Sequence, residues 1–452
     1  MLEFFRWVFN VVKIAISLDV ADLSYLYVPH NLEYTLLSRV GVPRPGVFFR
    51  IGSFIWRMFY VLWKRPLSFK KHPPNSVLFF AKTNNQERAL RTLADNISHP
   101  LFVGVDGFGT KQLPVFWAYF FSIPFLPCVC FKFFKAKGAE RKAFSYVFDF
   151  YWLSYGVYIL VRQVLRKTNP DLIVLANDHV MWTRVFILAA RDADIPTVYI
   201  QHASVTERFP PLTVDYALLE GKDTAEKYAT RGKSKTKAFL IGIPRLDQYF
   251  SKINYDHSLQ TIGVCVGLQN TPEQLEPLCR ALQQHTSTFK FVLRPHPADP
   301  RKEAWQKIAS EANWQFSNNA EDAFQYLSRV DAIVSGDSNI LLEAVLMNVN
   351  AICYDFSGEN LDWYGFQKHG LVEYFSEPNS IVQYLYELLD SLPSDVRNKA
   401  KRYCSTINTK YDGCSQELAV ELINQFVNRN SGSFEDWQLI DLGNYLSVYE
   451  PV

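Results

Sequence analysis

The chain has 452 residues, which is enough for two or three domains of ordinary size, and 48% of them are hydrophobic. Charged residues make up 20%, so the composition excludes a disordered chain and predicts a globular protein with a large core. The net charge of +2 hides an asymmetry, because residues 1–145 contain 19 Lys and Arg against 8 Asp and Glu, whereas the remainder contains 28 against 37.

Positive charge gathers in the N-terminal third, where nine Lys or Arg and no acidic residue lie between Glu33 and Glu87. Such an excess indicates an anionic partner, and the many aromatic residues beside it fit a lipid surface better than a nucleic acid. A solvated basic face is the plain alternative. We therefore expect a membrane surface as a partner, and no nucleic acid.

Two N-terminal segments combine basic and apolar residues at helical spacing. Residues 2–18 place their charges on one helical face, and in residues 48–71 the basic side chains Arg50, Arg57 and Lys64 recur every seven positions. This pattern is typical of a helix that lies in a membrane interface. A core helix whose arginines reach out to solvent is the alternative.

The run from Leu113 to Phe131 contains 19 uncharged residues and is long enough to cross a bilayer. Three prolines (Pro114, Pro124 and Pro127) interrupt it, and a single crossing would leave the rest of the chain on the opposite side from the first strands. We expect instead a segment that dips into the membrane or lines an acceptor site. A buried core segment is the alternative.

Strands and helices alternate through the following part of the chain, as a parallel α/β domain requires. The expected strands are residues 76–81, 101–105, 171–176, 197–200, 214–219 and 238–241. The expected helices are residues 84–97, 146–166, 182–193 and 224–229.

Polar side chains follow two successive strands of this domain. Asp178 and His179 come after residues 171–176, and His202 comes after residues 197–200. Because ligands bind at the carboxyl edge of an open parallel sheet, these side chains are expected to face one site. Asp178 and His202 are both candidates for deprotonating an acceptor hydroxyl, since burial raises the pKa of a carboxylate and imidazole titrates near neutral pH. Capping of the next helix is the plain alternative for Asp178.

A second α/β alternation follows a polar stretch at residues 248–257, which we interpret as a linker between domains. Its first strand, residues 261–266, ends at Gly267, where a loop can approach a ligand closely. Residues 380–392 and 416–427 are predicted to be closing helices. The latter is a candidate to pack back across the domain junction.

The strand that begins at Phe291 stops at two prolines and carries Arg294 and His296 to its carboxyl end. An arginine can hold phosphate oxygens bidentately, and a histidine beside it can donate a further hydrogen bond. We therefore expect both side chains to bind the phosphates of a donor.

Residues 331–347 predict a strand, a small polar turn and a helix, with Ser335 and Ser338 in the turn. Ser338 or Asn339 can cap the helix, whose free amides favour a phosphate. Glu343 falls one turn inside the helix, within reach of sugar hydroxyls. Capping alone would explain Ser338, but the arginine and histidine of the preceding strand favour a donor site.

Four motifs in this order resemble those of GT-B glycosyltransferases, above all the bacterial capsule-polysaccharide and teichoic-acid-polymerase-like groups. The motifs are Gln201-His202, Gly242-Ile243-Pro244-Arg245-Leu246-Asp247, Arg294-Pro295-His296-Pro297 and Ser335-Gly336-Asp337-Ser338-Asn339 with Glu343 after it. They cover about residues 170–357. Ala203 stands where the family's Gln-His-Gly element has glycine, which puts the local backbone path in doubt more than the histidine.

The resemblance implies the GT-B fold class, with two Rossmann-like, doubly wound parallel-sheet domains that face a cleft. We divide the chain into a basic, aromatic, helical and membrane-associating region at residues 1–75, an acceptor-side domain at residues 76–250, a donor domain at residues 258–425 and a tail at residues 426–452. The catalytic candidates are Asp178 and His202. The donor-binding candidates are Arg294, His296, Ser335, Ser338, Asn339, Glu343, Gly242 and Gly267.

The implied activity is transfer of a sugar or a polyol phosphate from a nucleotide-activated donor, such as a CMP- or CDP-linked one. The acceptor would be a lipid-linked saccharide or a polysaccharide in bacterial surface-polysaccharide biosynthesis, at the inner face of the cytoplasmic membrane. No metal or other cofactor is expected, because no Asp-x-Asp pair stands at a strand end and the basic side chains with the helix start can neutralise a departing phosphate. A nucleotide-sugar epimerase of the same architecture and a non-catalytic membrane-associated scaffold are two other classes that fit.

Overall fold

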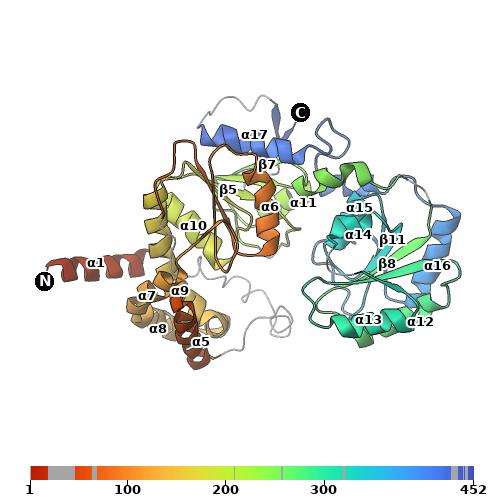
Figure 1. The fold of residues 1–452 in the computed structure, drawn as a ribbon, viewed down its shortest axis with the longest axis horizontal. Coiled ribbons are helices and arrows are strands. Elements are labelled where there is room, and N and C mark those ends of the chain that lie inside the picture. The colour runs from red at the N-terminus through yellow and green to blue at the C-terminus, as the bar shows by residue number, and fades with distance from the viewer. Residues whose placement is uncertain are drawn as a thin grey trace.

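The computed structural model describes residues 2–18, 46–63, 69–207, 209–255, 258–317, 321–428, 436–440, 442 and 446–451. Figure 1 shows two α/β lobes, each built on its own sheet. Residues 19–45 and Lys64, which belong to the predicted N-terminal region, lie outside the described residues.

The first lobe contains a nine-stranded sheet in the order β14-β15-β7-β6-β5-β4-β1-β2-β3, parallel except for the β14–β15 pair. Its strands are β1 (Val77–Ala81), β2 (Pro100–Gly104), β3 (Lys111–Gln112), β4 (Leu172–Leu175), β5 (Thr197–Ile200), β6 (Tyr216–Leu219), β7 (Lys237–Leu240), β14 (Trp437–Ile440) and β15 (Ser447–Pro451). Its helices include α6 (Asn84–Ala94), α9 (Gly138–Thr168), α10 (Met181–Arg191), α11 (Lys222–Ala229) and α17 (Ser415–Val427). The central strands are continuous apolar runs because helices cover both faces of the sheet.

The second lobe contains a six-stranded parallel sheet in the order β10-β9-β8-β11-β12-β13. Its strands are β8 (Thr261–Val266), β9 (Lys290–Pro295), β10 (Gln315–Phe316), β11 (Ala332–Ser335), β12 (Asn350–Tyr354) and β13 (Glu373–Phe375). Its helices are α12 (Pro272–Gln283), α13 (Lys302–Glu311), α14 (Ala323–Leu327), α15 (Ile340–Leu346), α16 (Pro378–Asp390) and the short η4 (Arg397–Arg402). Separate apolar clusters fill its two faces.

The strand order reverses at one place in each sheet. In the first sheet β1 lies between β2 and β4, and in the second β8 lies between β9 and β11. Ligands of open α/β sheets bind beyond the carboxyl ends of the strands at such reversals. The loops that follow β4 and β11, which contain Asp178 and Ser338, therefore occupy the expected positions for a site.

The chain crosses between the lobes twice. Residues of the predicted linker belong to η3 (Pro244–Lys252), a 3₁₀ helix that buries Leu246 and Tyr249 in the second lobe's core. After η4 the chain returns, and Phe426 of α17 stacks on Tyr216 of β6 with ring centroids 3.9 Å apart. In Figure 1, α17 lies along the first lobe. The tail then adds β15 beside β7, so the end of the chain completes the first sheet.

Several helices gather at one end of the first lobe, away from the second (Figure 1). They are α1 (Leu2–Ser17), α5 (Val47–Tyr60) with η1 (Val61–Trp63), α7 (Val115–Ser122), η2 (Ile123–Phe125) and α8 (Leu126–Lys135). Arg50 of α5 is buried and lies 2.5 Å from Asp149 of α9, and Arg57 lies 3.3 Å from the same carboxylate. The arginines of α5 thus face α9 and leave the aromatic side of the helix exposed.

The apolar run of the sequence analysis forms a broken helix rather than one straight element. Within the described residues, one stretch, Val115–Lys135, is long and apolar enough to cross a membrane by length and composition. Pro124 and Pro127 lie where η2 separates α7 from α8. One side of this broken helix packs Phe125 and Val129 against the core of the first lobe, while the other side is exposed.

Candidate active site

The loop after β4 holds a buried carboxylate that is fixed from two sides. Asp178 is 1% exposed, and its Oδ2 accepts a hydrogen bond of 2.7 Å from the hydroxyl of Tyr228 on α11. Its Oδ1 lies 2.9 Å from Nδ1 of His179. The neighbouring Asn177 accepts from the amides of His179 and Val180 through its Oδ1 and so closes the turn before α10, a helix that no side chain caps. Helix capping therefore does not explain Asp178.

This geometry fixes the protonation pattern of His179. Nδ1 faces the Asp178 carboxylate and so carries a proton, whereas Nε2 lies 3.3 Å from the side-chain amide nitrogen of Asn177 and serves as an acceptor. A carboxylate that orients an imidazole in this way also stabilises the imidazolium that forms when Nε2 takes up a proton.

His202, after β5, shares this edge of the sheet. Burial, together with the positive charge of Arg245, lowers the pKa of His202 to about 4. The imidazole is therefore neutral at physiological pH, and its buried Nδ1 has no hydrogen-bond partner within the described part of the chain.

Sequence reasoning missed Glu220, which follows β6 just as Asp178 and His202 follow β4 and β5. Glu220 is 2% exposed, and its Oε2 accepts a 3.0 Å hydrogen bond from the side chain of Gln201. The Glu220 amide in turn donates to the Gln201 side-chain oxygen at 2.9 Å. Burial raises the pKa of Glu220 to about 7, partly opposed by Arg245. The signal that could have found it is its place directly after a predicted strand.

Side chains of both lobes meet at this edge. The hydroxyl of Ser204, in the loop after β5, donates a 2.6 Å hydrogen bond to Oδ1 of Asn339, and the Ser204 amide reaches the same oxygen at 3.2 Å. Asn339 also donates to Oε1 of Glu343, which lies 2.5 Å from Nη1 of Arg245. Asn339 and Glu343, both predicted to bind the donor, thus hold the β11–α15 loop against the first lobe.

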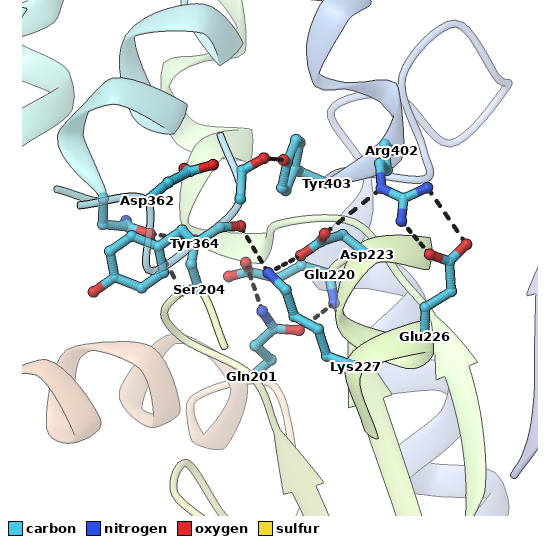
Figure 2. A network of polar contacts seen from close by, with 12 residues as sticks. Gln201, Ser204, Glu220, Asp223, Glu226, Lys227, Asp362, Tyr364, Arg402 and Tyr403 are labelled. Carbon is cyan, nitrogen blue, oxygen red and sulfur yellow. Dashed lines mark hydrogen bonds and ion pairs between the residues drawn. The ribbon is translucent and has the colours of Figure 1, made fainter. Parts of the chain in front are cut away.

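A second set of polar contacts joins the lobes beside α11 (Figure 2). Lys227 lies 2.5 Å from the carboxylate of Asp223 and donates a 2.8 Å hydrogen bond to the backbone carbonyl of Tyr364. Arg402 contacts Asp223 at 3.6 Å and also pairs with Glu226. These contacts fix the loop around residue 364 next to the carboxyl end of β6.

The structure corrects the expectation for Arg294, which does not offer its guanidinium at the strand's carboxyl edge. Arg294 is 5% exposed, donates 2.9 Å and 3.1 Å hydrogen bonds to the Ser317 hydroxyl and the Glu321 carbonyl, and lies over the ring of Tyr326. These partners belong to segments that follow β9 in the chain, so the strand pattern could not reveal them. Arg294 contributes to the internal packing of the second lobe.

His296 does lie at the surface, beyond the end of β9. Its Nδ1 accepts a 3.1 Å hydrogen bond from the Ala298 amide, so the proton of the neutral ring lies on Nε2. Partial burial, with Arg294 nearby, lowers the pKa of His296. The side chain can therefore donate a hydrogen bond outward while uncharged.

The turn after β11 contains a carboxylate among its hydroxyls. Ser335 is buried at the end of the strand and Ser338 is half-buried. Burial raises the pKa of Asp337 between them to about 7, and its carboxylate accepts a 2.5 Å hydrogen bond from the Trp363 amide. Asp337 lies within the Ser335–Asn339 motif, but the sequence alone predicts no role for it.

The two candidate glycines serve different purposes. Gly242 has φ +75°, and a Cβ there would lie 2.2 Å from the Thr406 hydroxyl. Glycine is therefore required at this point, where the chain that returns from the second lobe passes the end of β7. Gly267 donates its amide to the side chain of Asn270 at 2.7 Å, which closes the loop after β8. Among the described residues, no group of three or more His, Cys, Asp or Glu side chains is arranged to hold a metal ion.

Two parallel sheets of this kind, whose carboxyl edges meet through the loops after β5 and β11, define a GT-B-like fold. No model of a known protein family matches the sequence, and no curated protein matches it either. Solved structures do match.

A putative UDP-N-acetylglucosamine 2-epimerase from Listeria monocytogenes aligns with a TM-score of 0.53 and 13% identity, over 79% of this chain and 98% of that one. The UDP-GlcNAc 2-epimerase from Neisseria meningitidis, bound to UDP-GlcNAc, aligns with a TM-score of 0.50 and 13% identity, over 77% and 99%. The wall teichoic acid polymerase TagF aligns with a TM-score of 0.47 and 10% identity, over 86% and 99%. The alignments with the two epimerases support the fold, and identities this low leave the reaction open.

Proposed function

We propose that this protein is a glycosyltransferase that moves a sugar or a polyol phosphate from a nucleotide-activated donor to a lipid-linked or polysaccharide acceptor. The observation that carries the proposal is the convergence of Asp178–His179, His202 and Glu220 at the carboxyl edge of the first sheet, directly against the β11–α15 loop of the second. Both sheets contribute the loops beside their strand reversals, where nucleotide ligands of such folds bind.

The first lobe provides a proton acceptor for the acceptor hydroxyl. Nε2 of His179, backed by the Asp178 carboxylate, exchanges its 3.3 Å hydrogen bond from the Asn177 amide for one from the acceptor hydroxyl, and takes the proton as the hydroxyl oxygen attacks the donor. His202, a neutral imidazole at the same edge, accepts a hydrogen bond from the incoming hydroxyl. In this proposal His202 stays in the catalytic site as predicted, whereas Asp178, predicted to take the proton itself, positions His179, which takes it.

The second lobe binds the phosphates of the donor. His296 donates from Nε2, and Ser338 with the amides of its turn lies at the neighbouring strand reversal. Because hydrogen bonds from donors already in place stabilise charge that develops on the departing phosphate, the reaction needs no metal. CMP- and CDP-linked donors are the first candidates.

We place the protein on the inner face of the cytoplasmic membrane, as a peripheral protein. The helices at the far end of the first lobe expose large apolar side chains, with Phe48 at 91% and Trp56 at 72%. Others on this surface are Phe9, Phe49, Phe59, Trp117, Phe120, Phe131 and Phe134. Exposed basic residues lie at the end of α8 and at the start of α9: Lys135, Lys137, Arg141 and Lys142. Aromatic side chains beside basic ones match an anionic lipid surface.

Donor binding can be tested by thermal unfolding with CMP, CDP, UDP, GDP and UDP-GlcNAc. We expect one nucleotide to stabilise the wild type selectively, by about 2.7 kcal/mol at roughly 100 times its Kd, and His296→Ala to lose most of that gain. His285→Ala, which removes a histidine elsewhere on the second lobe, should respond like the wild type.

Product analysis separates the transferase from its closest alternative. Incubation with UDP-GlcNAc and no acceptor should leave the sugar unchanged. Conversion to a second nucleotide-sugar isomer would contradict the proposal in favour of an epimerase. Absence of stabilisation by every nucleotide would favour a non-catalytic scaffold.

A further inference from the structure

Unpaired polar atoms concentrate where the two lobes meet. Glu220 is 2% exposed, and while Gln201 donates to its Oε2, its Oε1 has no hydrogen-bond partner among the described residues. Unlike a surface carboxylate, Glu220 cannot turn this oxygen toward bulk water, since the pair of hydrogen bonds with Gln201 holds the side chain in place.

Arg245 presents the complementary donors. Its Nη1 pairs with Glu343, but its Nε and Nη2 are buried and make no hydrogen bond to any part of the chain that the structure describes. The ring of Phe324 packs against the guanidinium, with 5.5 Å from its carbon to the ring centroid. Electrostatic interactions link Arg245 both to Glu220 and to His202, whose Nδ1 is the fourth unpaired atom of the group.

Buried groups of this kind are almost always satisfied in native proteins, because each unpaired one weakens the fold. The chemistry of the four atoms restricts what can satisfy them. A phosphate only accepts hydrogen bonds, so when Glu220 is ionised a phosphate would match Arg245 alone and would be repelled by the carboxylates of Glu220 and Glu343. A cation would match Glu220 alone and would be repelled by Arg245.

A hydroxyl group both donates and accepts. One hydroxyl can accept from Arg245 and donate to Glu220, and a neighbouring hydroxyl can donate to Nδ1 of His202. We propose that Glu220, Arg245 and His202 form a subsite for adjacent hydroxyl groups, which takes the sugar or polyol part of a substrate and not its phosphates. The inference rests on the proposed function for the identity of that substrate.

The test uses Glu220→Gln in the full chain. Glutamine has the same size as glutamate. Its side-chain oxygen can take the place of Oε2 and accept the hydrogen bond from Gln201. Its NH₂ group then takes the place of Oε1, so the acceptor at that position is lost. Glu226→Gln is the control, because it makes the same change on α11, the helix that follows Glu220, where the carboxylate already pairs with Arg402. Circular dichroism and the unfolding midpoint verify that both variants fold.

Binding is measured by saturation-transfer NMR with glycerol, N-acetylglucosamine and N-acetylneuraminic acid, and by calorimetry with each nucleotide and its sugar conjugate. We expect at least one hydroxyl compound to bind the wild type and to bind Glu220→Gln about tenfold more weakly, with bare nucleotides unaffected and Glu226→Gln unchanged.

The outcomes separate this inference from the proposed function. Loss of affinity for bare nucleotide and conjugate alike would assign the cluster to the phosphates and overturn the inference. Equal binding of every hydroxyl compound by wild type and Glu220→Gln, or no binding at all, would mean that water alone fills the subsite. Binding of a hydroxyl compound that depends on Glu220, with no nucleotide bound, would uphold the subsite and refute the transferase.

Discussion

The buried carboxyl of Glu220 makes stability depend on pH at the scale of a single residue. Its folded-state pKa of about 7 exceeds its ordinary value of 4.5, so the native state keeps a proton that the unfolded chain has released. The free energy of unfolding therefore falls as pH rises from about 4.5 to about 7, and the loss is complete above that window. Glu220→Gln should remove this contribution, on the order of 2 kcal/mol, and be more stable than the wild type at about pH 8. Denaturant titrations across the range test this; parallel curves for the two proteins would contradict it.

Tyr228 positions the Asp178–His179 pair by donating to the buried carboxylate. Tyr228→Phe should cost about 1–2 kcal/mol of stability and lower kcat by roughly tenfold or more, while KM for the donor changes little, because the hydroxyl makes no proposed contact with the donor. Steady-state kinetics on the activity identified by the nucleotide screen provides the measurement. Tyr216→Phe, on a strand of the same sheet, is the control; an equal fall in kcat for both variants would refute the positioning role.

Strand-end reasoning located part of the site from the sequence because it is a geometric rule: Asp178 and His202 follow neighbouring parallel strands and so had to share an edge. The rule applies equally to Glu220, which was overlooked. The prediction that Arg294 binds phosphate rests on its residue type, its place at a strand end and the motif around it. Its partners Ser317 and Glu321 come from later segments, and no periodicity in the sequence shows that they contact β9. The sequence predicts which charged side chains lie at a strand end. Whether another part of the same lobe already binds such a side chain can be seen only in the folded structure.

At the scale of elements, α17 joins the first lobe although its neighbours in the chain belong to the second. Phe426 is 5% exposed, stacks on Tyr216 and contacts the ring of Phe239 at a tilt. Phe426→Ala should therefore destabilise the first lobe by about 3–4 kcal/mol. Asn424→Ala, on the exposed side of the same helix, should change stability by less than about 0.5 kcal/mol. Urea unfolding of the two variants tests this, and similar midpoints would mean that α17 is not part of that core.

The longer strands and helices were predictable because their apolar runs are unbroken and are flanked by turns. The linker prediction was incomplete, since η3 buries Leu246 and Tyr249 from a stretch that is mostly polar. The short edge strands β3, β10 and β13 carried no signal, because two or three residues show no period. The tail strands are defined by pairing, since β15 pairs with β7 and β14 pairs with β15, and the contact with β7 exists only in the folded chain.

At the scale of the whole molecule, the exposed aromatic surface of α5 predicts a membrane-binding face. The double variant Trp56→Ser, Phe59→Ser should bind anionic lipid vesicles about tenfold or more weakly, since both side chains would otherwise leave water for the interface. Stability should hardly change, because both are already exposed. Leu389→Ser, an exposed apolar site on α16 of the second lobe, is the control in vesicle sedimentation. Equal binding by all three proteins would refute the membrane face.

Two lobes of alternating strands and helices could be expected from the sequence, but not which surfaces they bring together. The pair Ser204–Asn339 joins the two lobes, and Arg245–Glu343 joins the connecting helix η3 to α15; each side chain alone looks like an ordinary surface or ligand-binding residue. Only the contact distances in the folded structure show that these side chains fix how the lobes meet. These contacts also bring together Glu220, Arg245 and His202, the three residues of the proposed hydroxyl subsite.

The double crossing between the lobes has a consequence for how the protein is made. β7 ends at Leu240, and the strand that covers its outer edge begins only at Ser447. During translation most of the first lobe leaves the ribosome before the second lobe is made. The outer edge of β7 and the surface that α17 covers therefore stay exposed until the second lobe has been translated. An uncovered strand edge invites pairing with other chains. The nascent first lobe is therefore the stage of biogenesis at which protection by chaperones matters most.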